Sequence, residues 1–278
     1  MDQLATTLRT QLTGSVIAPG DAAYDGARRV HNGLIDRRPA LIARCHGSGD
    51  VQAAVRAGRE YGLSIAVRGG GHNVAGNAVC DGGLVIDLSE MRGVHVDPRL
   101  RRARAQGGST WGDYNRETQL YGLASTGGVV SSTGIGGLTL GGGLGYLMGV
   151  QGMAVDCLRA ATLVGASGDV LRVSEDEHPD LFWAIRGGGG NFGVATWLEY
   201  EVQPVGPIVT AGLVAHPFSA ARDVLRFLRD FTTALPDDLT VFGGLVHAPD
   251  GSGAKLAAII ACHAGPLEAG SLAVEPIK

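Results

Sequence analysis

The sequence AVRGGGHNVAGNAVCDGGLVIDLS occupies residues 66–89. A short apolar run ends at Val67, and the loop RGGGHN follows at 68–73. Because glycine has no Cβ, three in a row let the backbone bend sharply and approach a ligand closely. A strand that feeds such a loop aims its N–H groups at one place, which forms a concavity for anions. The loop ends in a histidine, a neutral nitrogen nucleophile. The pattern indicates a phosphate-bearing cofactor, and the alternative is a tight turn with a surface histidine.

A second feature is the long segment 118–155, which contains no charged residue and is rich in glycine. A membrane span needs about 20 mainly apolar residues in a helix. Glycine costs about 1 kcal/mol per helical position relative to alanine, so this segment is a poor helix. Its serines and threonines also make it too polar to span a membrane. We expect this backbone to lie against a large ligand, with N–H groups and hydroxyls that suit a pyrophosphate and the polar edge of a fused ring.

A third glycine run, 187–193, matches the dinucleotide fingerprint G-x-G-x-x-G at Gly188, Gly190 and Gly193. That fingerprint must follow a strand and open a helix. Here the order is reversed, because 177–186 reads as a helix and 194–202 alternates like a half-buried strand. The run is therefore interpreted as a helix end and strand entry that could also touch a cofactor. Tight binding of NAD or NADP is not expected.

Composition narrows the function classes. The 278 residues suffice for one large or two modest domains, and the net charge of −4 does not favour nucleic-acid binding. One basic cluster is expected to be a solvated strand face: Arg99, Arg101, Arg102 and Arg104. Four widely spaced cysteines form no C-x-x-C pair, so neither a zinc site nor a disulfide scaffold is predicted. The first residues lack the basic and apolar regions of a signal peptide, which predicts a cytoplasmic protein.

The periodic segments predict an α+β organisation with helices outside short strands. Residues 1–35 read as a short helix and an irregular lead-in. Asp50 or Ser48 is expected to cap a helix that ends near Tyr61, and Thr110-x-x-Asp113 predicts a capping box for a helix at 111–121. Strands are expected at 64–68 and 84–88, with hairpins at 94–96 and 101–105 and at 158–164 and 170–173. A new unit begins after Pro207, with a strand at 208–215, a helix at 219–234, strands at 240–246 and 255–262, and a last helix from Leu267.

Three segments together resemble one family: residues 66–89, GLASTGGVVSSTGIGGLTLGGGLGYLM at 122–148, and DLFWAIRGGGGNFGVATWLEY at 180–200. They are similar to the berberine-bridge-enzyme-like FAD-linked oxidases of the vanillyl-alcohol oxidase and p-cresol methylhydroxylase (PCMH) superfamily. The resemblance implies a two-lobed FAD-binding domain of the PCMH type at 36–206. It also implies that 207–278 is the start of an antiparallel-sheet substrate domain. Family members continue beyond this point, so we expect a sequence truncated at its C-terminus.

The resemblance also implies the site residues. His72 matches the histidine that bonds through a ring nitrogen to the flavin 8α-methyl carbon, so FAD is expected to be covalently held. Some members add a bond from a cysteine, but Val130 stands at that position, which implies a single linkage. Other histidines lack metal-ligand spacing, and no metal is expected. The predicted cofactor-binding residues are Arg68, Gly69, Gly70, Gly71, His72, Asn73, Gly128, Ser132, Thr133, Gly136, Gly137, Gly141, Gly142, Gly145 and Gly193.

The expected function is FAD-dependent oxidation. Hydride would leave a C–H bond next to a hydroxyl or amine of a sugar, alkaloid or other secondary metabolite, and the electrons would pass to O2. The partners are then a small-molecule substrate and O2, with no nucleic acid and no membrane. No motif assigns the residue that takes the substrate proton, and Tyr114, Tyr121 and Tyr146 stay open. The alternatives are an FAD-dependent dehydrogenase that excludes oxygen and a non-catalytic or fragmentary flavin-binding protein.

Overall fold

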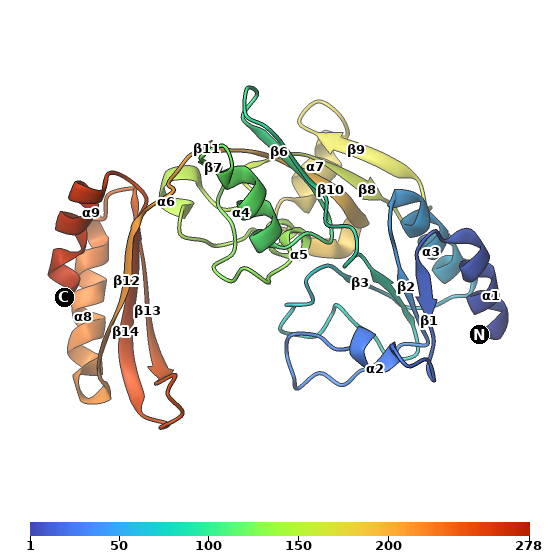
Figure 1. Ribbon diagram of the computed structural model, residues 1–278, viewed down its shortest axis with the longest axis horizontal. Coiled ribbons are helices and arrows are strands. Elements are labelled where there is room, and N and C mark those ends of the chain that lie inside the picture. Colours follow the sequence, from blue (N-terminus) through green and yellow to red (C-terminus); the bar gives the residue numbers. More distant parts are fainter.

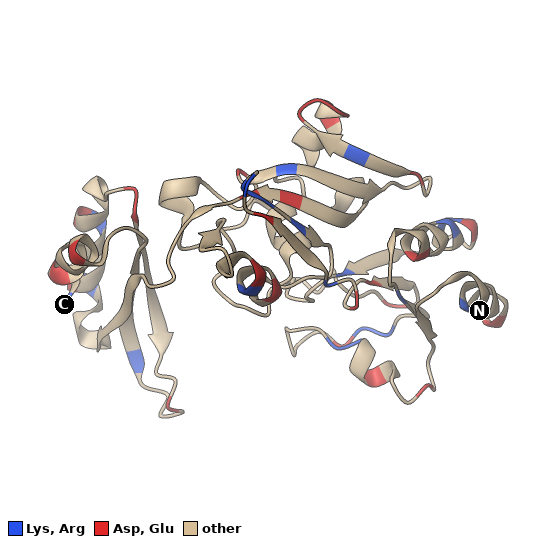
Figure 2. Ribbon diagram, turned by 45° about the horizontal axis from the view of Figure 1, so that its top comes forward, with Lys and Arg blue, Asp and Glu red and all other residues tan.

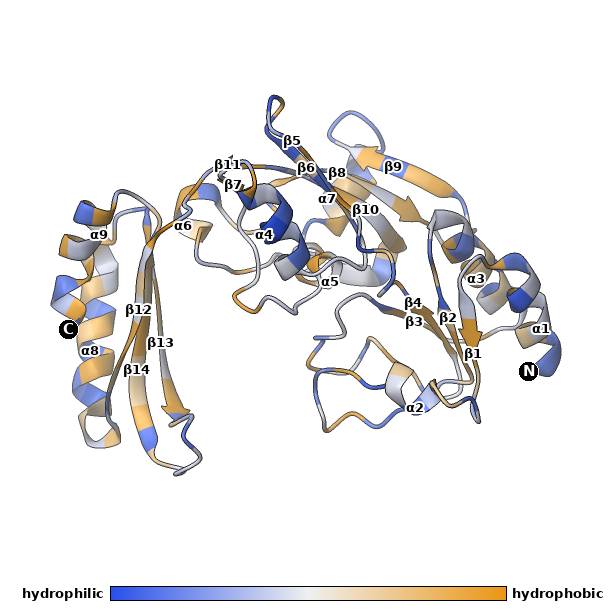
Figure 3. Ribbon diagram, viewed as in Figure 1, coloured by the Kyte–Doolittle hydropathy of each residue, from blue (hydrophilic) through white to orange (hydrophobic).

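The computed structural model describes residues 1–278, and the chain forms three consecutive units (Figure 1). The first lobe, residues 1–91, is built on a four-stranded sheet in the order β1-β2-β4-β3. Its strands are β1 (Ser15–Ile17), β2 (Leu41–Arg44), β3 (Ile65–Arg68) and β4 (Leu84–Asp87). Strands β2, β3 and β4 are parallel, and β1 is antiparallel to β2. These strands are hydrophobic along most of their length because helices and loops bury both faces (Figure 3).

The helices of the first lobe pack on this sheet. They are α1 (Asp2–Gln11), the short α2 (Tyr24–Ala27) and α3 (Ser48–Glu60). Residues 1–35 contain more structure than the expected lead-in, since Leu4 and Leu8 of α1 lie in one core with Leu41 of β2, and β1 extends the sheet. The expected cap of α3 was wrong. Gly47 is the N-cap and no side chain caps the helix, because Asp50 instead accepts N–H groups from outside it.

The second lobe, residues 92–206, is built on a five-stranded antiparallel sheet in the order β5-β6-β10-β8-β9. The strands are β5 (Val94–Asp97), β6 (Arg102–Gln106), β8 (Leu158–Val164), β9 (Val170–Ser174) and β10 (Val194–Glu201). Both predicted hairpins are confirmed. A two-stranded pair, β7 (Leu123–Ala124) and β11 (Gln203–Pro204), lies beside the sheet. Buried Trp111, Tyr114 and Tyr200 contact one another in the core of this lobe.

The helices of the second lobe follow the sequence signals. Helix α4 (Trp111–Gln119) begins with the predicted capping box, in which the hydroxyl of Thr110 accepts the N–H of Asp113 and the carboxylate of Asp113 accepts the N–H of Thr110. The charge-free segment supplies two short helices, α5 (Ile135–Leu140) and α6 (Met148–Gln151). Helix α7 (Pro179–Ile185) and the 3-10 turn η1 (Gly189–Phe192) precede β10.

The C-terminal unit, residues 207–278, is a three-stranded antiparallel sheet covered on one face by two helices (Figure 1). Its strands are β12 (Thr210–Pro217), β13 (Leu239–His247) and β14 (Lys255–His263), with β14 in the centre. Helices α8 (Ala221–Phe231) and α9 (Leu267–Val274) lie on the outer side. This unit has its own small core, which includes Val224, Ile259 and Ile277.

Charged residues of both signs are distributed over all three units (Figure 2). The basic cluster near residue 100 only partly forms the expected strand face, because Arg102 and Arg104 lie on β6 while Arg99 and Arg101 lie in the turn before it. Arg102 pairs with Glu201 at 3.5 Å, and the guanidinium of Arg104 lies 4.5 Å from the ring centre of Trp197. All four cysteines are free thiols. None of the helices has the length and apolar character needed to cross a membrane.

Candidate functional site

A cavity of about 930 Å³ lies where the first lobe meets the charge-free segment of the second lobe. This volume is in the upper part of the range for ligand and cofactor pockets, roughly 300–1,000 Å³. Five parts of the chain line the cavity: Arg37, β3 with the loop to Asn73, the loop 74–80, the segment from Thr133 to Gly141, and Gly189–Asn191 of η1. A smaller cavity of about 330 Å³ lies between α6 and the C-terminal unit.

Glycine is required where the two lobes touch beside this cavity. A Cβ at Gly70 would lie 2.2 Å from the backbone nitrogen of Gly134, and a Cβ at Gly134 would lie 2.3 Å from the nitrogen of Gly70. Gly71 has φ +70°, a conformation that side chains rarely adopt. The loop after β3 and the start of α5 therefore meet backbone to backbone at the cavity wall.

His72 lies at this junction and lines the cavity. Its Nε2 is 3.0 Å from the hydroxyl of Ser132, and its Nδ1 is 3.4 Å from the hydroxyl of Thr133. One face of the ring is stacked on His31, with ring centres 4.0 Å apart and planes inclined by 13°. Residues from two distant parts of the sequence thus hold the imidazole of His72.

The half-buried environment of His72 keeps the imidazole neutral. Burial lowers the pKa of His72 below its ordinary value, and the nearby charge of His31 lowers this pKa further. At neutral pH the ring is therefore in the form in which one nitrogen carries a free electron pair. A neutral, oriented imidazole at the wall of a cavity is a competent nucleophile.

Two arginines near the cavity are engaged with the backbone. Arg68 donates through Nη1 to the carbonyl of Ala27, while its buried Nε has no partner; no carboxylate pairs with it. Arg37, which the sequence analysis did not single out, lines the cavity. Its Nη1 donates to the carbonyls of Gly76 and Val79, both at 3.0 Å, and so fixes the loop 74–80. Neither guanidinium is paired with a carboxylate, and both hold backbone carbonyls of neighbouring segments instead.

The predicted cofactor-binding residues fall into two groups. Eight of them line the cavity: Gly69, Gly70, Gly71, His72, Asn73, Thr133, Gly137 and Gly141. Ser132 reaches the site through its contact with His72. The remaining six do not line the cavity: Arg68, Gly128, Gly136, Gly142, Gly145 and Gly193.

Backbone packing explains several glycines in the second group. A Cβ at Gly145 would lie 1.9 Å from the carbonyl oxygen of Gly127, and one at Gly193 would lie 2.6 Å from the carbonyl oxygen of Val164. Gly142 and Gly193 have φ of +110° and +140°. A Cβ at Gly128 would crowd Leu138 and Trp111. A run of glycines in the sequence thus combines positions that face the cavity with positions that let the backbone fold.

Sequence reasoning missed part of the lining. Gly134 and Leu138 lie between predicted residues, and Gly189, Gly190 and Asn191 belong to the run in which we expected a helix end. The order is as expected, since α7 precedes these glycines and β10 follows them. The run also reaches the cavity, as the sequence allowed, but through Gly189, Gly190 and Asn191 rather than the predicted Gly193. His31 carried no signal in the sequence, because its role arises only from the stacking on His72.

None of the three tyrosines left open as proton acceptors lines the cavity. Tyr114 is buried and hydrogen-bonded to Ser125 at 2.9 Å, and burial raises its pKa. Tyr121 is exposed, and the ring of Tyr146 packs against Phe242 of the C-terminal unit. The acid–base role remains unassigned among the residues around this cavity.

Known proteins share the sequence and the fold of this chain. Residues 39–174 match the FAD binding domain family. The (R)-6-hydroxynicotine oxidase of Paenarthrobacter nicotinovorans is 42% identical over 247 residues, which are 87% of this chain and 54% of that protein. The chain spans about half the length of the curated relatives it matches.

Solved structures give the same result. The structure of 6-hydroxy-D-nicotine oxidase from Arthrobacter nicotinovorans superposes with a TM-score of 0.89 at 36% identity, over 96% of this chain and 59% of the other. Xylooligosaccharide oxidase from Myceliophthora thermophila superposes with a TM-score of 0.85 at 27% identity, over 99% and 58% of the two chains. The resemblance expected from the three glycine-rich motifs is confirmed, as is the α+β fold of the PCMH type. The chain therefore contains an FAD binding domain and is homologous to FAD-linked oxidoreductases.

Proposed function

We propose that this chain is the FAD-binding part of an oxidase, together with the start of its substrate domain. The reaction removes hydride from a C–H bond next to a hydroxyl or amine, and O2 takes the electrons. The relatives named for a hydroxylated nicotine and for xylooligosaccharides support this class of small amine and sugar substrates. The single observation that carries the proposal is the neutral, oriented His72 in the wall of a cofactor-sized cavity.

The residues around the cavity fit FAD. The backbone of 69–73 and of 133–141 leaves room for a large ligand, because the glycines add no side chains there. Peptide N–H groups can neutralise a pyrophosphate without lysine or arginine. Leu138 and the β3 residues Ile65 and Val67 offer apolar surface to a ring system. When bound, FAD supplies a two-electron acceptor for hydride.

We propose further that His72 holds FAD through one covalent bond from a ring nitrogen. The hydroxyls of Ser132 and Thr133 orient the ring, and the lowered pKa of His72 keeps an electron pair available at neutral pH. Val130, where the family resemblance would place a second linkage through cysteine, is half exposed and has no nucleophilic atom. A single linkage is therefore proposed.

Two alternative functions differ from the oxidase, one in the electron acceptor and the other in whether a residue accepts the substrate proton. The absence of a tyrosine in the cavity lining favours, as second candidate, a chain that binds flavin without catalysing oxidation. An FAD-dependent dehydrogenase is the third. Assays of peroxide formation in air, set beside reduction of an artificial acceptor without O2, separate the oxidase from the dehydrogenase. No turnover with either acceptor, by protein that holds FAD, would favour the non-catalytic candidate.

The covalent linkage is tested by mass. Protein loaded with FAD is denatured, and its intact mass is measured before and after removal of free flavin. We expect the wild-type chain to retain one FAD and His72→Ala to release it. His95→Ala, at an exposed histidine of β5, is the control and should retain flavin like the wild type. Complete release of flavin from the denatured wild type would show that the linkage does not form.

A further inference from the structure

The segment 27–37 runs beside the loop that carries His72, although some 40 residues separate them in sequence. The N–H of His31 donates to the carbonyl of Gly71 at 3.0 Å. The side-chain amide of Asn32 donates to the carbonyl of Val74 at 2.8 Å. These two bonds fix the segment to the loop immediately before and after His72.

The segment is itself anchored on both sides of His31. Arg28 forms ion pairs with Asp25 and Asp36, and the carbonyl of Ala27 accepts the guanidinium of Arg68. Arg37 then binds the carbonyls of the loop 74–80. The position of His31 is thus determined by polar contacts that its own side chain does not make.

The side chain of His31 has one contact that bears on the cavity, the stack on His72. The edges of the His72 ring meet the hydroxyls of Ser132 and Thr133, and one face meets His31. A hydroxyl can donate to or accept from either ring nitrogen, so the two hydroxyls alone do not fix the plane of the ring. The terminal torsion of histidine is broad, and a stacked ring restricts it.

We propose that His31 is a positioning residue, whose imidazole covers one face of His72 and holds that ring in the plane from which a nitrogen attaches to FAD. The inference rests on the proposed function. Attachment forms a C–N bond between His72 and the flavin methyl carbon, while one N–H and one methyl C–H bond break. The two electrons and two protons pass to O2, which becomes H2O2. His31 forms no bond in this step and acts only through His72.

The expected size of the effect follows from how closely attachment constrains the reacting groups. Reacting groups must be held within a narrow range of distance and angle, and a misplacement of about 1 Å can cost about a hundredfold in rate. Removal of the stacked ring leaves both hydroxyl contacts of His72 intact, so the loss should be smaller. We expect a decrease of about tenfold in the rate constant of attachment, with little change in how tightly FAD first binds.

The experiment compares substitutions at His31 in the full chain. Protein prepared without flavin is mixed with saturating FAD, samples are denatured over time, and covalently held flavin is counted. His31→Ala and His31→Leu, which lack a flat ring, should attach FAD about tenfold more slowly. His31→Phe keeps a flat ring and should stay within about threefold of the wild type. His95→Ala is the histidine control.

A second measurement separates binding from attachment. FAD is titrated into His72→Ala and into the double variant that also carries His31→Ala, and the two dissociation constants should agree within about threefold. In the flavin-free wild type, NMR signals of the His72 ring should show the ring-current shift of a stacked neighbour. That shift should disappear in His31→Leu and persist in His31→Phe.

The outcomes distinguish this inference from the proposed function. Attachment by His31→Ala and His31→Leu at the wild-type rate would overturn the inference while the covalent linkage stands. Slow attachment by His31→Phe, equal to that of His31→Leu, would also overturn it, because a flat ring would then not suffice. A wild type that holds no covalent flavin would refute the linkage, and the role of His31 with it.

Discussion

At the scale of single residues, the protonation state of His72 makes a testable prediction. Burial disfavours the imidazolium, so the pKa of His72 in the folded protein lies below its ordinary value of about 6.5, and His31 lowers this pKa further. The neutral ring is the nucleophile, so the rate of covalent attachment should rise with pH and its midpoint should lie below about 6.5. The rate is measured from about pH 5 to about pH 8. A midpoint above the ordinary value would contradict the effect of burial.

The same lowered pKa of His72 has a consequence for stability. Because folding lowers the pKa of His72, the folded state binds the proton on this ring more weakly than the unfolded state does. The stability that neutral His72 contributes is therefore present above its unfolded pKa and is lost as the pH falls through its folded pKa. His31→Phe removes the charge of His31, which is one of the two causes that lower the pKa of His72. The midpoint of the attachment rate should therefore move to a higher pH in this variant.

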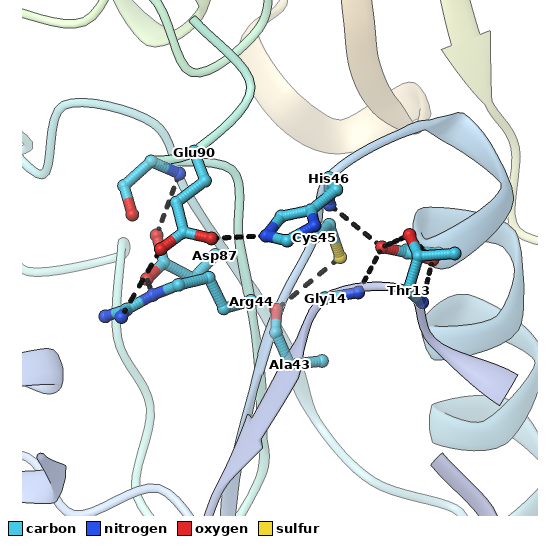
Figure 4. Close-up of polar contacts among 10 residues, drawn as sticks. Thr13, Gly14, Ala43, Arg44, Cys45, His46, Asp87 and Glu90 are labelled. Carbon is cyan, nitrogen blue, oxygen red and sulfur yellow. Dashed lines mark hydrogen bonds and ion pairs between the residues drawn. The ribbon is translucent and has the colours of Figure 1, made fainter. Parts of the chain in front are cut away.

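Asp50 makes a second prediction at this scale. Its buried carboxylate accepts the N–H groups of Thr13, Gly14 and His46 at 2.8, 3.1 and 2.9 Å. Figure 4 shows these three donors around the start of β1 and the end of β2. Burial alone raises the pKa of Asp50, but the hydrogen bonds from His46 and Thr13 outweigh it and the pKa is lowered. Asp50 therefore stabilises the fold above its unfolded pKa, and this stability is lost as the pH falls through the folded pKa.

Asp50→Asn is expected to destabilise the chain by about 1–3 kcal/mol, since an amide that replaces one oxygen leaves a buried N–H without an acceptor. Denaturant unfolding near neutral pH measures the loss, with Asp176→Asn at an exposed loop position as control. The variant should also lose less stability than the wild type on acidification. Equal stability of Asp50→Asn and the wild type at neutral pH would show that these hydrogen bonds contribute nothing net.

Single residues also mark where sequence reasoning stops. His72 could be predicted because a strand and three glycines precede it, and this pattern is typical of a loop that binds a ligand. Asp50 was expected to cap α3, but a buried carboxylate close to a strand end serves distant N–H groups better than its own helix. His31 could not be predicted, because its partner lies 41 positions away and stacking leaves no periodic signal.

At the scale of elements, α5 makes a prediction that separates ligand contact from folding. Gly137 lies in this helix and lines the cavity, and a Cβ there would meet nothing within 4 Å. Gly137→Ala should raise the stability of the flavin-free chain by up to about 1 kcal/mol, because alanine is the better helix former. Its methyl group points toward the space proposed for FAD, so FAD affinity should fall. Thermal unfolding and FAD titration measure the two effects.

Gly70→Ala is the counterpart, with its Cβ 2.2 Å from the nitrogen of Gly134. It should lower both stability and FAD retention, because the two lobes would be forced apart at the cavity. Gly49→Ala, in α3 and with open space around it, controls for the general effect of replacing a glycine. FAD affinity of Gly137→Ala equal to that of the wild type would show that α5 does not touch the cofactor.

Elements with a strong period were predictable. The hairpin of β5 and β6 alternates apolar and polar residues, and the hairpin of β8 and β9 joins two mainly apolar runs across a turn. The capping box of α4 follows directly from the spacing of Thr110 and Asp113. The loop 74–80 and the segment 27–37 were not predictable, since polar contacts through Arg37, Asn32 and Arg28 shape them. Such contacts join segments distant in sequence and have no periodicity.

At the scale of the whole molecule, the glycines that sequence reasoning grouped together serve two purposes. Some expose backbone to the cavity, and others let strands and turns approach within contact distance. The sequence alone predicts that such a segment is buried but not which glycines face the ligand, because both purposes require the same residue. The C-terminal unit was expected after Pro207 from the change in periodicity that follows it, whereas two lobes before it were expected only from the family resemblance.

The joint between the second lobe and the C-terminal unit gives the last prediction. Gly149 of α6 lies against the residues before β13, and a Cβ there would be 2.1 Å from the carbonyl oxygen of Asp237. Tyr146 packs edge to face on Phe242 close by, with ring centres 5.7 Å apart. The C-terminal unit has a core of its own, so the two bodies can separate without either one unfolding.

Gly149→Ala should therefore loosen this joint and increase the radius of gyration measured by small-angle X-ray scattering. FAD retention should be unchanged, since the large cavity is lined by neither α6 nor the C-terminal unit. Gly49→Ala should leave both quantities as in the wild type. Loss of FAD from Gly149→Ala at an unchanged radius of gyration would contradict this prediction. It would mean that α6 supports the cofactor cavity and does not hold the C-terminal sheet in place.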